Sequence, residues 1–345
     1  MTTQLQSLQF QVPEDPIGFY EYAYDQGWTD GLPVIPPTPQ LVEAFVRASG
    51  RPADYAVASL SPKEGVASIE KIAVNAVLAG CMPEYMPTLV AAVRAMAKPE
   101  FNLHSLQCTT NPCTPMLILN GPVRHQIEIN CGHNCLGPGV RSNATIGRAV
   151  RLMLLNIGGG VPGETDEATH GMPGKYTMCF GEMEEDSPWE PLHVERGFKR
   201  EDSTVTVVGA QGTTNVCCLL KRAESILGWT ANSIGRMGVN NTILGGGEYV
   251  TVFPPGHAKR LQEQGYDKAT VKKWLREHSR IPISSFPPEG NNPQGHWIIE
   301  GDYVYVTQKW QDMMVVVAGA PEPYHIVSMP TFGDTWAATE KIETP

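Results

Sequence analysis

Four short runs of apolar or β-branched residues constrain the fold of this 345-residue chain more than any other feature. They lie at residues 116–119, 204–208, 249–253 and 313–317, and a glycine or proline follows each within three residues. None of the four runs contains a charged residue, and 116–119 and 313–317 are continuously apolar, so we expect both faces of these strands to be covered. Segments with helical periodicity separate the runs. This order predicts an α/β fold with mixed or mainly parallel sheets covered by helices.

The length of the chain suggests more than one unit, since domains average roughly 150 residues. Helices are predicted at residues 68–79 and 143–156 in the first part of the chain, and at 268–278 in the second part. We therefore predict two α/β units, residues 1–198 and residues 199–345. The segment 161–198 has almost no periodicity but is rich in aromatic and acidic residues, which is typical of an ordered, functional loop.

Charge and hydropathy exclude several classes of protein. The formal net charge is −10 at pH 7 and the pI is about 5.4, which disfavours nucleic acid as a partner. No window approaches the ~18 apolar residues of a membrane span, and the first residues do not resemble a secretion signal. We expect a cytoplasmic protein without membrane contact. Charged residues make up only 18% of the chain, which favours a homo-oligomer with buried subunit contacts.

The stretch 101–143 holds four of the eight cysteines, in two close pairs on either side of the run 116–119. Cysteines in the cytoplasm are expected to be reduced, so the clustering calls for a chemical reason. One interpretation is thiol catalysis, in which only the thiolate attacks. Cys113 or Cys131 would then be the nucleophile, Cys135 the resolving thiol and His133 the base.

The same cysteines allow two other interpretations. Cys108, Cys113, Cys131 and Cys135 could bind zinc or an iron–sulfur cluster, although their Cys-x4-Cys and Cys-x3-Cys spacings differ from the Cys-x2-Cys of zinc ribbons. Alternatively they are small buried side chains without chemistry, because free cysteine is among the most buried residue types. The sequence leaves all three open.

Several polar residues are candidates for binding a small-molecule substrate. The segment 209–215, GAQGTTN, lies between a predicted strand and a helix predicted from Asn215 to about residue 227. Gly212, Thr213 and Asn215 could there bind an anion at the helix start, or the segment is a plain tight turn. Three further candidates lie near the cysteine-rich stretch or in the irregular segment: His104, Asn120 and Lys175.

Several longer segments of the sequence resemble those of a known protein family. They are WTDGLPVIPPT at 28–38, NPCTPMLILNGP at 111–122, NATIGRAVRLMLLN at 143–156, PGKYTMCF at 173–180, SPWEPLHVERGF at 187–198, and the region 254–282. Together they cover most of the chain and resemble the bacterial family associated with UGSC-motif proteins, which is loosely related to components of glycine, sarcosine, betaine and proline reductases. The chain has no Cys-Gly-Ser-Cys and no selenocysteine, and it departs from the selenoprotein pattern there.

The residues and the resemblance together lead to one expectation of function and two alternatives. We expect a cysteine-dependent enzyme that performs a redox or reductive-cleavage step on a small polar molecule, and a redox partner protein is one partner that such an enzyme could use. The first alternative is a zinc- or iron–sulfur-dependent lyase or hydrolase that uses the same cysteines as ligands. The second is a non-catalytic binding subunit.

Overall fold

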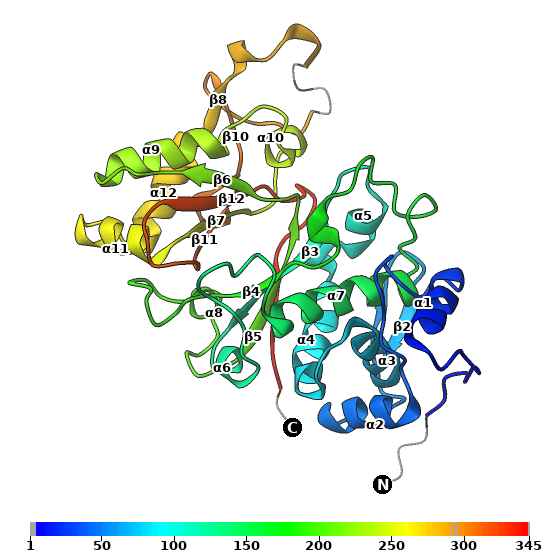
Figure 1. The fold of residues 1–345 in the computed structure, drawn as a ribbon. Helices are drawn as coiled ribbons and strands as arrows, with labels where there is room; N and C mark the ends of the chain where they lie inside the picture. The colour runs from blue at the N-terminus through cyan, green and yellow to red at the C-terminus, as the bar shows by residue number, and fades with distance from the viewer. Residues whose placement is uncertain (1–4, 291, 293–294, 344–345) are drawn as a thin grey trace.

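The computed structural model describes residues 5–290, 292 and 295–343. Its centre consists of four layers, in the order helices, sheet, sheet, helices (Figure 1). This arrangement confirms the α/β class predicted from the apolar runs. Within the described ranges, no helix combines the length and the apolar character needed to cross a lipid bilayer.

The first sheet has the strand order β13-β5-β3-β4. Strand β3 (Thr114–Asn120) pairs parallel with β4 (Cys179–Gly181) and antiparallel with β5 (Thr204–Ala210). Strand β13 (Ala338–Lys341) is antiparallel to β5 at the edge. Strand β3 contains the predicted run 116–119, and every residue of β3 and β5 is buried.

The second sheet has the order β11-β7-β12-β6. Strands β7 (Tyr249–Phe253) and β11 (Met313–Val317) are parallel, and they match the predicted runs at both ends. Strand β12 (His325–Met329) is antiparallel to β7, and β6 (Thr214–Cys217) pairs with β12 at the edge. Both sheets are therefore mixed.

The apolar runs cover two interfaces at once, which explains why they do not alternate with polar residues. Met116 and Ile118 of β3 pack in the cluster between the two sheets, whereas Leu117 and Leu119 pack in the cluster on the helix side. Residues of β7 and β11 divide in the same way. Helices thus cover only one face of each sheet, and the other sheet covers the second face. The prediction that helices cover the sheets is therefore correct for one face of each sheet and wrong for the other.

Helices pack on the two outer faces, and the N-terminal caps of two of them follow the sequence. Ser68 caps the helix predicted at 68–79 by accepting from the N–H of Lys71, and Asp267 caps the helix at 268–278 by accepting from that of Thr270. The helices on the first sheet are α3 (Ile69–Ala79), α4 (Met86–Met96) and α7 (Arg141–Asn156); those on the second are α9 (Ala223–Ile234), α11 (Pro255–Glu263) and α12 (Lys268–His278).

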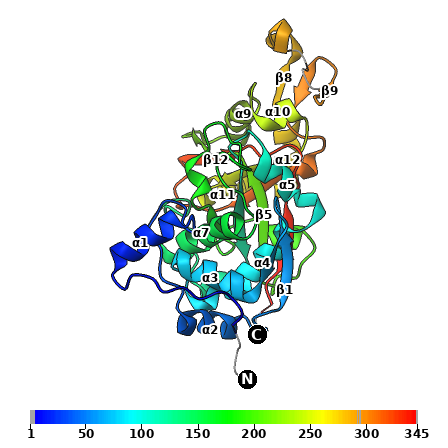
Figure 2. The same ribbon diagram turned by 90° about the vertical axis from the view of Figure 1, so that its right-hand side faces the viewer.

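Smaller elements surround the four layers. A hairpin of β1 (Ala56–Leu60) and β2 (Gly65–Ser68) precedes α3. An antiparallel group in the order β8-β10-β9 projects from the second sheet (Figure 2). The other α-helices and strands are α1 (Pro16–Asp25), α2 (Pro39–Ala48), α5 (Leu103–Cys108), α6 (Val123–Gln126), α8 (Leu192–Glu195), α10 (Asn240–Leu244), β8 (Arg280–Pro282), β9 (Ile298–Glu300) and β10 (Tyr303–Tyr305).

The two sheets do not divide at the predicted boundary between residues 198 and 199. The chain remains in the first sheet until Ala210, builds the second sheet from Thr214 to Met329, and returns to the first at Ala338. The prediction of a helix from Asn215 is wrong. Residues 214–217 form the edge strand β6, because their register with β12 satisfies the backbone hydrogen bonds, and α9 begins only at Ala223.

Candidate functional site

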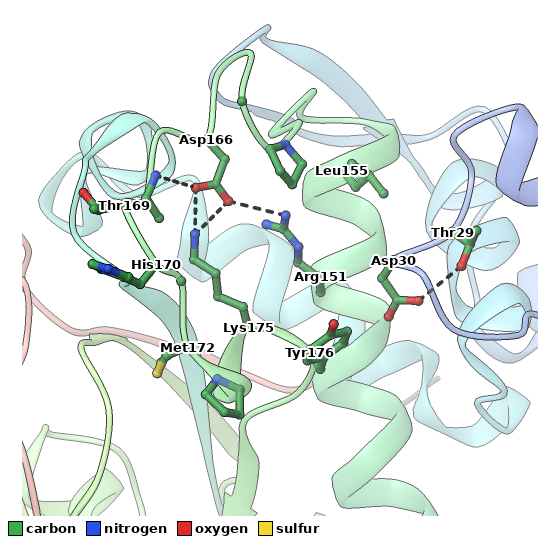
Figure 3. Close-up of a pocket in the computed structure, with 15 residues that line it drawn as sticks. Thr29, Asp30, Arg151, Leu155, Asp166, Thr169, His170, Met172, Lys175 and Tyr176 are labelled. Atoms are coloured by element: carbon green, nitrogen blue, oxygen red, sulfur yellow. Dashed lines mark hydrogen bonds and ion pairs between the residues drawn. The ribbon is translucent and has the colours of Figure 1, made fainter.

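A cavity of about 600 Å³ lies between α7, the irregular loop that follows it, and a turn near the N-terminus (Figure 3). We call it the ion-pair pocket and define it by Thr29, Asp30, Arg151, Asp166 and Lys175, all of which line it. In Figure 3 the side chains of Arg151, Asp166 and Lys175 point toward one another. The functional groups therefore come from three segments, which are the turn near the N-terminus, α7 and the loop that follows α7.

Helix α7 supplies one wall because its spacing places Arg148, Arg151 and Leu155 along one side. The helix approaches the chain before β4 very closely. A Cβ atom on Gly147 would lie 2.4 Å from Oγ1 of Thr177 and 2.7 Å from the backbone N of Met178. Any larger residue at this position would push α7 away from the loop that carries Lys175.

The loop after α7 is folded tightly by its own hydrogen bonds. Gly158 N–H donates to the carbonyl of Met153 at 3.0 Å and ends the helix. The carbonyl of Val161 then accepts from the N–H groups of Thr165 and Asp166, both at 3.0 Å. This turn directs the Asp166 side chain inward, where the residue is only 7% exposed.

Asp166 is the centre of the ion pairs. Lys175 Nζ lies 2.7 Å from each carboxylate oxygen of Asp166, and Arg151 Nη2 lies 3.4 Å from Oδ2. The backbone N–H of Ala168 donates to Oδ1 at 3.2 Å. Buried carboxylates are expected to be paired in this way, because an unpaired buried charge is costly.

A second ion pair fastens the N-terminal turn to α7. Arg148 donates to both carboxylate oxygens of Asp30, at 2.9 and 2.8 Å, and its Nη2 also donates to the carbonyl of Pro33 at 2.9 Å. A planar guanidinium that meets a carboxylate with two parallel bonds gives a rigid geometry. Thr29 and Asp30 of the segment 28–38 thus form part of the wall of the ion-pair pocket.

The electrostatics of the pocket favour one more negative charge. Arg148 is matched by Asp30, whereas Arg151 and Lys175 share Asp166. Burial lowers the pKa of Arg151, although the charges of Asp166 and Asp30 act to raise it. The guanidinium still carries its charge, so the two carboxylates compensate its loss of hydration only in part. An anionic ligand would complete that compensation.

A second cavity, of about 480 Å³, lies against the second sheet. We call it the thiol pocket and define it by Cys135, His133, Pro254, Ala318 and His325, all of which line it. Pro254 and Ala318 directly follow β7 and β11, and His325 begins β12. Cys135 is 6% exposed, while His133 and His325 are exposed. Two predicted catalytic residues, Cys135 and His133, therefore share one cavity.

The four clustered cysteines do not come together. Cys131 packs in the cluster on the helix side of the first sheet, whereas Cys135 packs in the cluster between the sheets. Cys113 accepts a hydrogen bond from Asn240 Nδ2 at 3.3 Å, and Cys108 ends α5. Among the residues that the structure describes, no three His, Cys, Asp or Glu side chains form a group suited to a metal ion. The predicted four-cysteine ligand set is thus not assembled.

The thiols also lie in environments that favour the neutral form. Burial raises the pKa of Cys113 to about 12 and that of Cys135 to about 11. Burial likewise raises the pKa of Cys131 and of Cys108. Because the thiolate is the nucleophile, none of the four is activated by its surroundings at neutral pH.

The other predicted binding residues are spread over the molecule. Lys175 is the one that lies in the ion-pair pocket. Gly212 lies near that pocket, since a Cβ on it would be 3.5 Å from Sδ of Met172. Thr213 and Asn215 are exposed, and the anion site expected from them has no helix start because β6 follows the turn. His104 is exposed on α5.

Asn120 has a structural role at the far end of β3. Its Nδ2 donates to Glu182 Oε2 at 2.6 Å and to Glu184 Oε1 at 3.1 Å. Glu182 is 1% exposed and also accepts from the N–H of Leu192 at 2.7 Å. From the sequence alone, the acidic run 182–186 would be expected to be exposed to solvent. In the structure, part of it instead belongs to a buried hydrogen-bond network that holds the loop after β4.

Sequence reasoning missed Asp30, Arg151 and Asp166 as functional candidates. A signal was present for Arg151, since the arginines of the segment 143–156 fall on the polar side of its helical pattern. The two aspartates gave no signal. Asp30 meets Arg148, which lies 118 residues later in the chain, and Asp166 lies in a segment without helical or strand periodicity.

Comparison of the chain with known protein families gives no match. Comparison with functionally characterised proteins gives no significant match either. The resemblance to the UGSC-associated family therefore stays a prediction.

Proposed function

We propose that this protein binds a small organic acid in the ion-pair pocket. The observation that carries the proposal is the buried group of Arg151 and Lys175 around the single carboxylate of Asp166. The side chains of Arg151, Asp166 and Lys175 are 11%, 6% and 17% exposed, so water screens their charges weakly. A carboxylate that enters would meet two cations that share one counter-ion.

The contacts already made leave donors for such a ligand. In the described part of the chain, Arg151 donates only through Nη2, to Gly160 O at 3.3 Å and to Asp166. Its Nε and Nη1 groups are therefore free to donate, but their N–H bonds do not point the same way, so a carboxylate would accept a single hydrogen bond from one of them. Leu155 and Met172 also line the cavity and would contact the apolar body of an acid.

The test is a binding measurement on purified protein with benzoate and with inorganic phosphate, by isothermal titration calorimetry. We expect benzoate to bind and Arg151→Lys to weaken this binding by about tenfold or more, because lysine does not carry the planar, fixed set of donors of the guanidinium group. Arg47→Met, at an arginine whose side chain is 63% exposed, is the matched control and should leave binding unchanged. Tighter binding of phosphate than of benzoate would mean that the natural ligand carries a phosphate group and not a carboxylate. If Arg151→Lys binds benzoate as tightly as the wild-type protein does, the proposed site is refuted.

Thiol-dependent redox chemistry on a small molecule is a second proposal, and one observation favours it. Cys135 and His133 both line the thiol pocket, so a substrate there would meet a thiol and an imidazole. Cys131 is a weaker candidate for a resolving thiol, since it packs in a different cluster. Loss of turnover in Cys135→Ser, with activity retained in Cys113→Ser, would support this proposal; activity retained in both would exclude it.

A further inference from the structure

The position of the thiol pocket in the fold is a reason to consider it a ligand site in its own right. It lies just beyond the carboxyl ends of the parallel strands β7 and β11, where Pro254 and Ala318 follow the last strand residues. In open α/β sheets ligands bind in the crevice outside the carboxyl ends of the strands. The turn that contains His133 and Cys135 comes from the part of the chain that builds the first sheet, and it also lines the cavity.

The wall of the thiol pocket differs from that of the ion-pair pocket in charge. It contains no lysine and no arginine, and Glu322, which is exposed, is the one acidic residue among the lining side chains. Val252 of β7, Ala318 just after β11 and Val327 of β12 supply apolar surface. An anion would find no counter-charge here, so this wall suits an uncharged ligand.

The thiol of Cys135 faces this cavity without a partner for its proton. The buried thiols of Cys81 and Cys131 donate to the carbonyls of Thr145 and Ile129, at 3.2 and 3.5 Å, and Cys113 accepts from Asn240. The backbone N–H groups of Cys135 and Leu136 act on the Cys135 sulfur, but within the described residues its own proton has no acceptor. The same holds for the proton of Cys179 and of Cys218, but of these three buried thiols only Cys135 lines one of the two cavities. A buried S–H donor that has no acceptor, on the wall of a cavity, is a position where a ligand or solvent molecule can accept from it.

We propose that the thiol pocket is a second binding site, which takes a small uncharged molecule with an apolar body. The apolar body contacts the strand ends, and a polar group of the ligand lies between Cys135 and the histidines at the mouth. This site is separate from the ion-pair pocket, because the two cavities share no lining residue. It does not depend on whether an organic acid binds at Arg151.

The experiment uses prodan, an uncharged naphthalene dye whose emission shifts to shorter wavelength in apolar surroundings. We expect saturable binding to the wild-type protein, weakened about tenfold or more in Ala320→Trp, where the indole would fill the cavity from a half-exposed wall position. Arg151→Lys should bind the dye like wild type, which separates this proposal from that of the organic acid. Absence of a saturable shift, or equal binding by Ala320→Trp, would overturn the second site.

A second measurement covers the case in which Ala320→Trp fails to fold. Bound prodan should slow the reaction of Cys135 with N-ethylmaleimide by several-fold, as followed by peptide mass spectrometry. The exposed Cys217 on β6 is the internal control and should react at the same rate with and without dye. If the dye leaves the Cys135 rate unchanged, it does not occupy this cavity and the proposal fails.

Discussion

The ion-pair pocket and the thiol pocket are built by different means. Side chains of opposite charge from three segments define the first, so its shape depends on Asp166 and Asp30 holding their partners. Strand ends define the second, so its shape depends on the register of β7, β11 and β12. The comparison shows that a loop can form a cavity when charges hold it, whereas neighbouring strands form a cavity through the topology of the sheet alone.

The difference predicts how each pocket responds to change. Removing one charge from the ion-pair pocket leaves a buried charge without its partner, and this is among the costliest single changes in a protein. The thiol pocket has no such charge, so chemical access to Cys135 is its most direct readout. The predictions that follow run from the largest expected effect to the smallest.

Replacement of Asp166 by Asn should lower the free energy of unfolding by about 3 kcal/mol or more, because Arg151 and Lys175 then lose their shared counter-ion. Urea denaturation followed by circular dichroism measures this. Glu164→Gln in the same loop is the matched control: its pair with Lys63 is exposed, and the change should be at most about 1 kcal/mol. Equal effects of the two substitutions would mean that the ion-pair pocket is not held by charge.

Acid should destabilise the part of the fold behind the thiol pocket, where His257 is fully buried on α11 and contacts the carbonyl of Cys218 at 3.0 Å. Burial lowers the pKa of His257 to about 4 from its ordinary value near 6.5. Between these values the unfolded chain holds a proton that the folded chain lacks, so stability falls as pH falls. The loss should reach about 2–3 kcal/mol between pH 7 and pH 4.

His257→Gln should lack this part of the acid dependence, while its amide retains a donor for the carbonyl of Cys218. Unfolding free energies at pH 7, 5.5 and 4 for both proteins provide the comparison. Parallel curves for the two would show that His257 does not titrate between these pH values.

Alkylation of the folded protein should separate Cys135 from Cys113, since Cys135 lines a cavity and Cys113 is 1% exposed. Because the pKa of Cys135 is raised to about 11, its rate with iodoacetamide should rise about tenfold per pH unit from pH 7 to pH 10 without levelling off. Each such step corresponds to about 1.4 kcal/mol. A rate that levels off near pH 8, or faster labelling of Cys113, would contradict the description of the thiol pocket.

Several parts of the fold were predictable because their causes are local. Strands β7 and β11 have the predicted bounds, since continuous apolar runs that end at proline or glycine specify buried strands. Asp267 caps α12 because a short side-chain acceptor before a helical pattern meets the free N–H groups of the first turn. Residues 214–217 were mispredicted because the partner strand that fixes them, β12, lies more than a hundred residues later.

The candidate sites were predictable only in part, for the same reason. Lys175 was predicted as a binding residue and Cys135 with His133 as catalytic residues, but the sequence gave no sign that they line two different cavities. The clustering of four cysteines suggested one centre. In the structure, the short turn between Cys131 and Cys135 passes from one layer to the next, and the two thiols pack in different cores.

The sequence by itself determined the α/β class, the bounds of β7, β11 and α12, and the chemical types available to a site, because propensity, capping and burial patterns act over a few residues. Only the tertiary structure decided that Asp30 meets Arg148, that Asp166 lies between Arg151 and Lys175, and that Cys135 alone of the four clustered cysteines lines the second cavity. These contacts depend on how loops pack between layers, and the energy of a charge or a thiol is set by neighbours that no local pattern specifies.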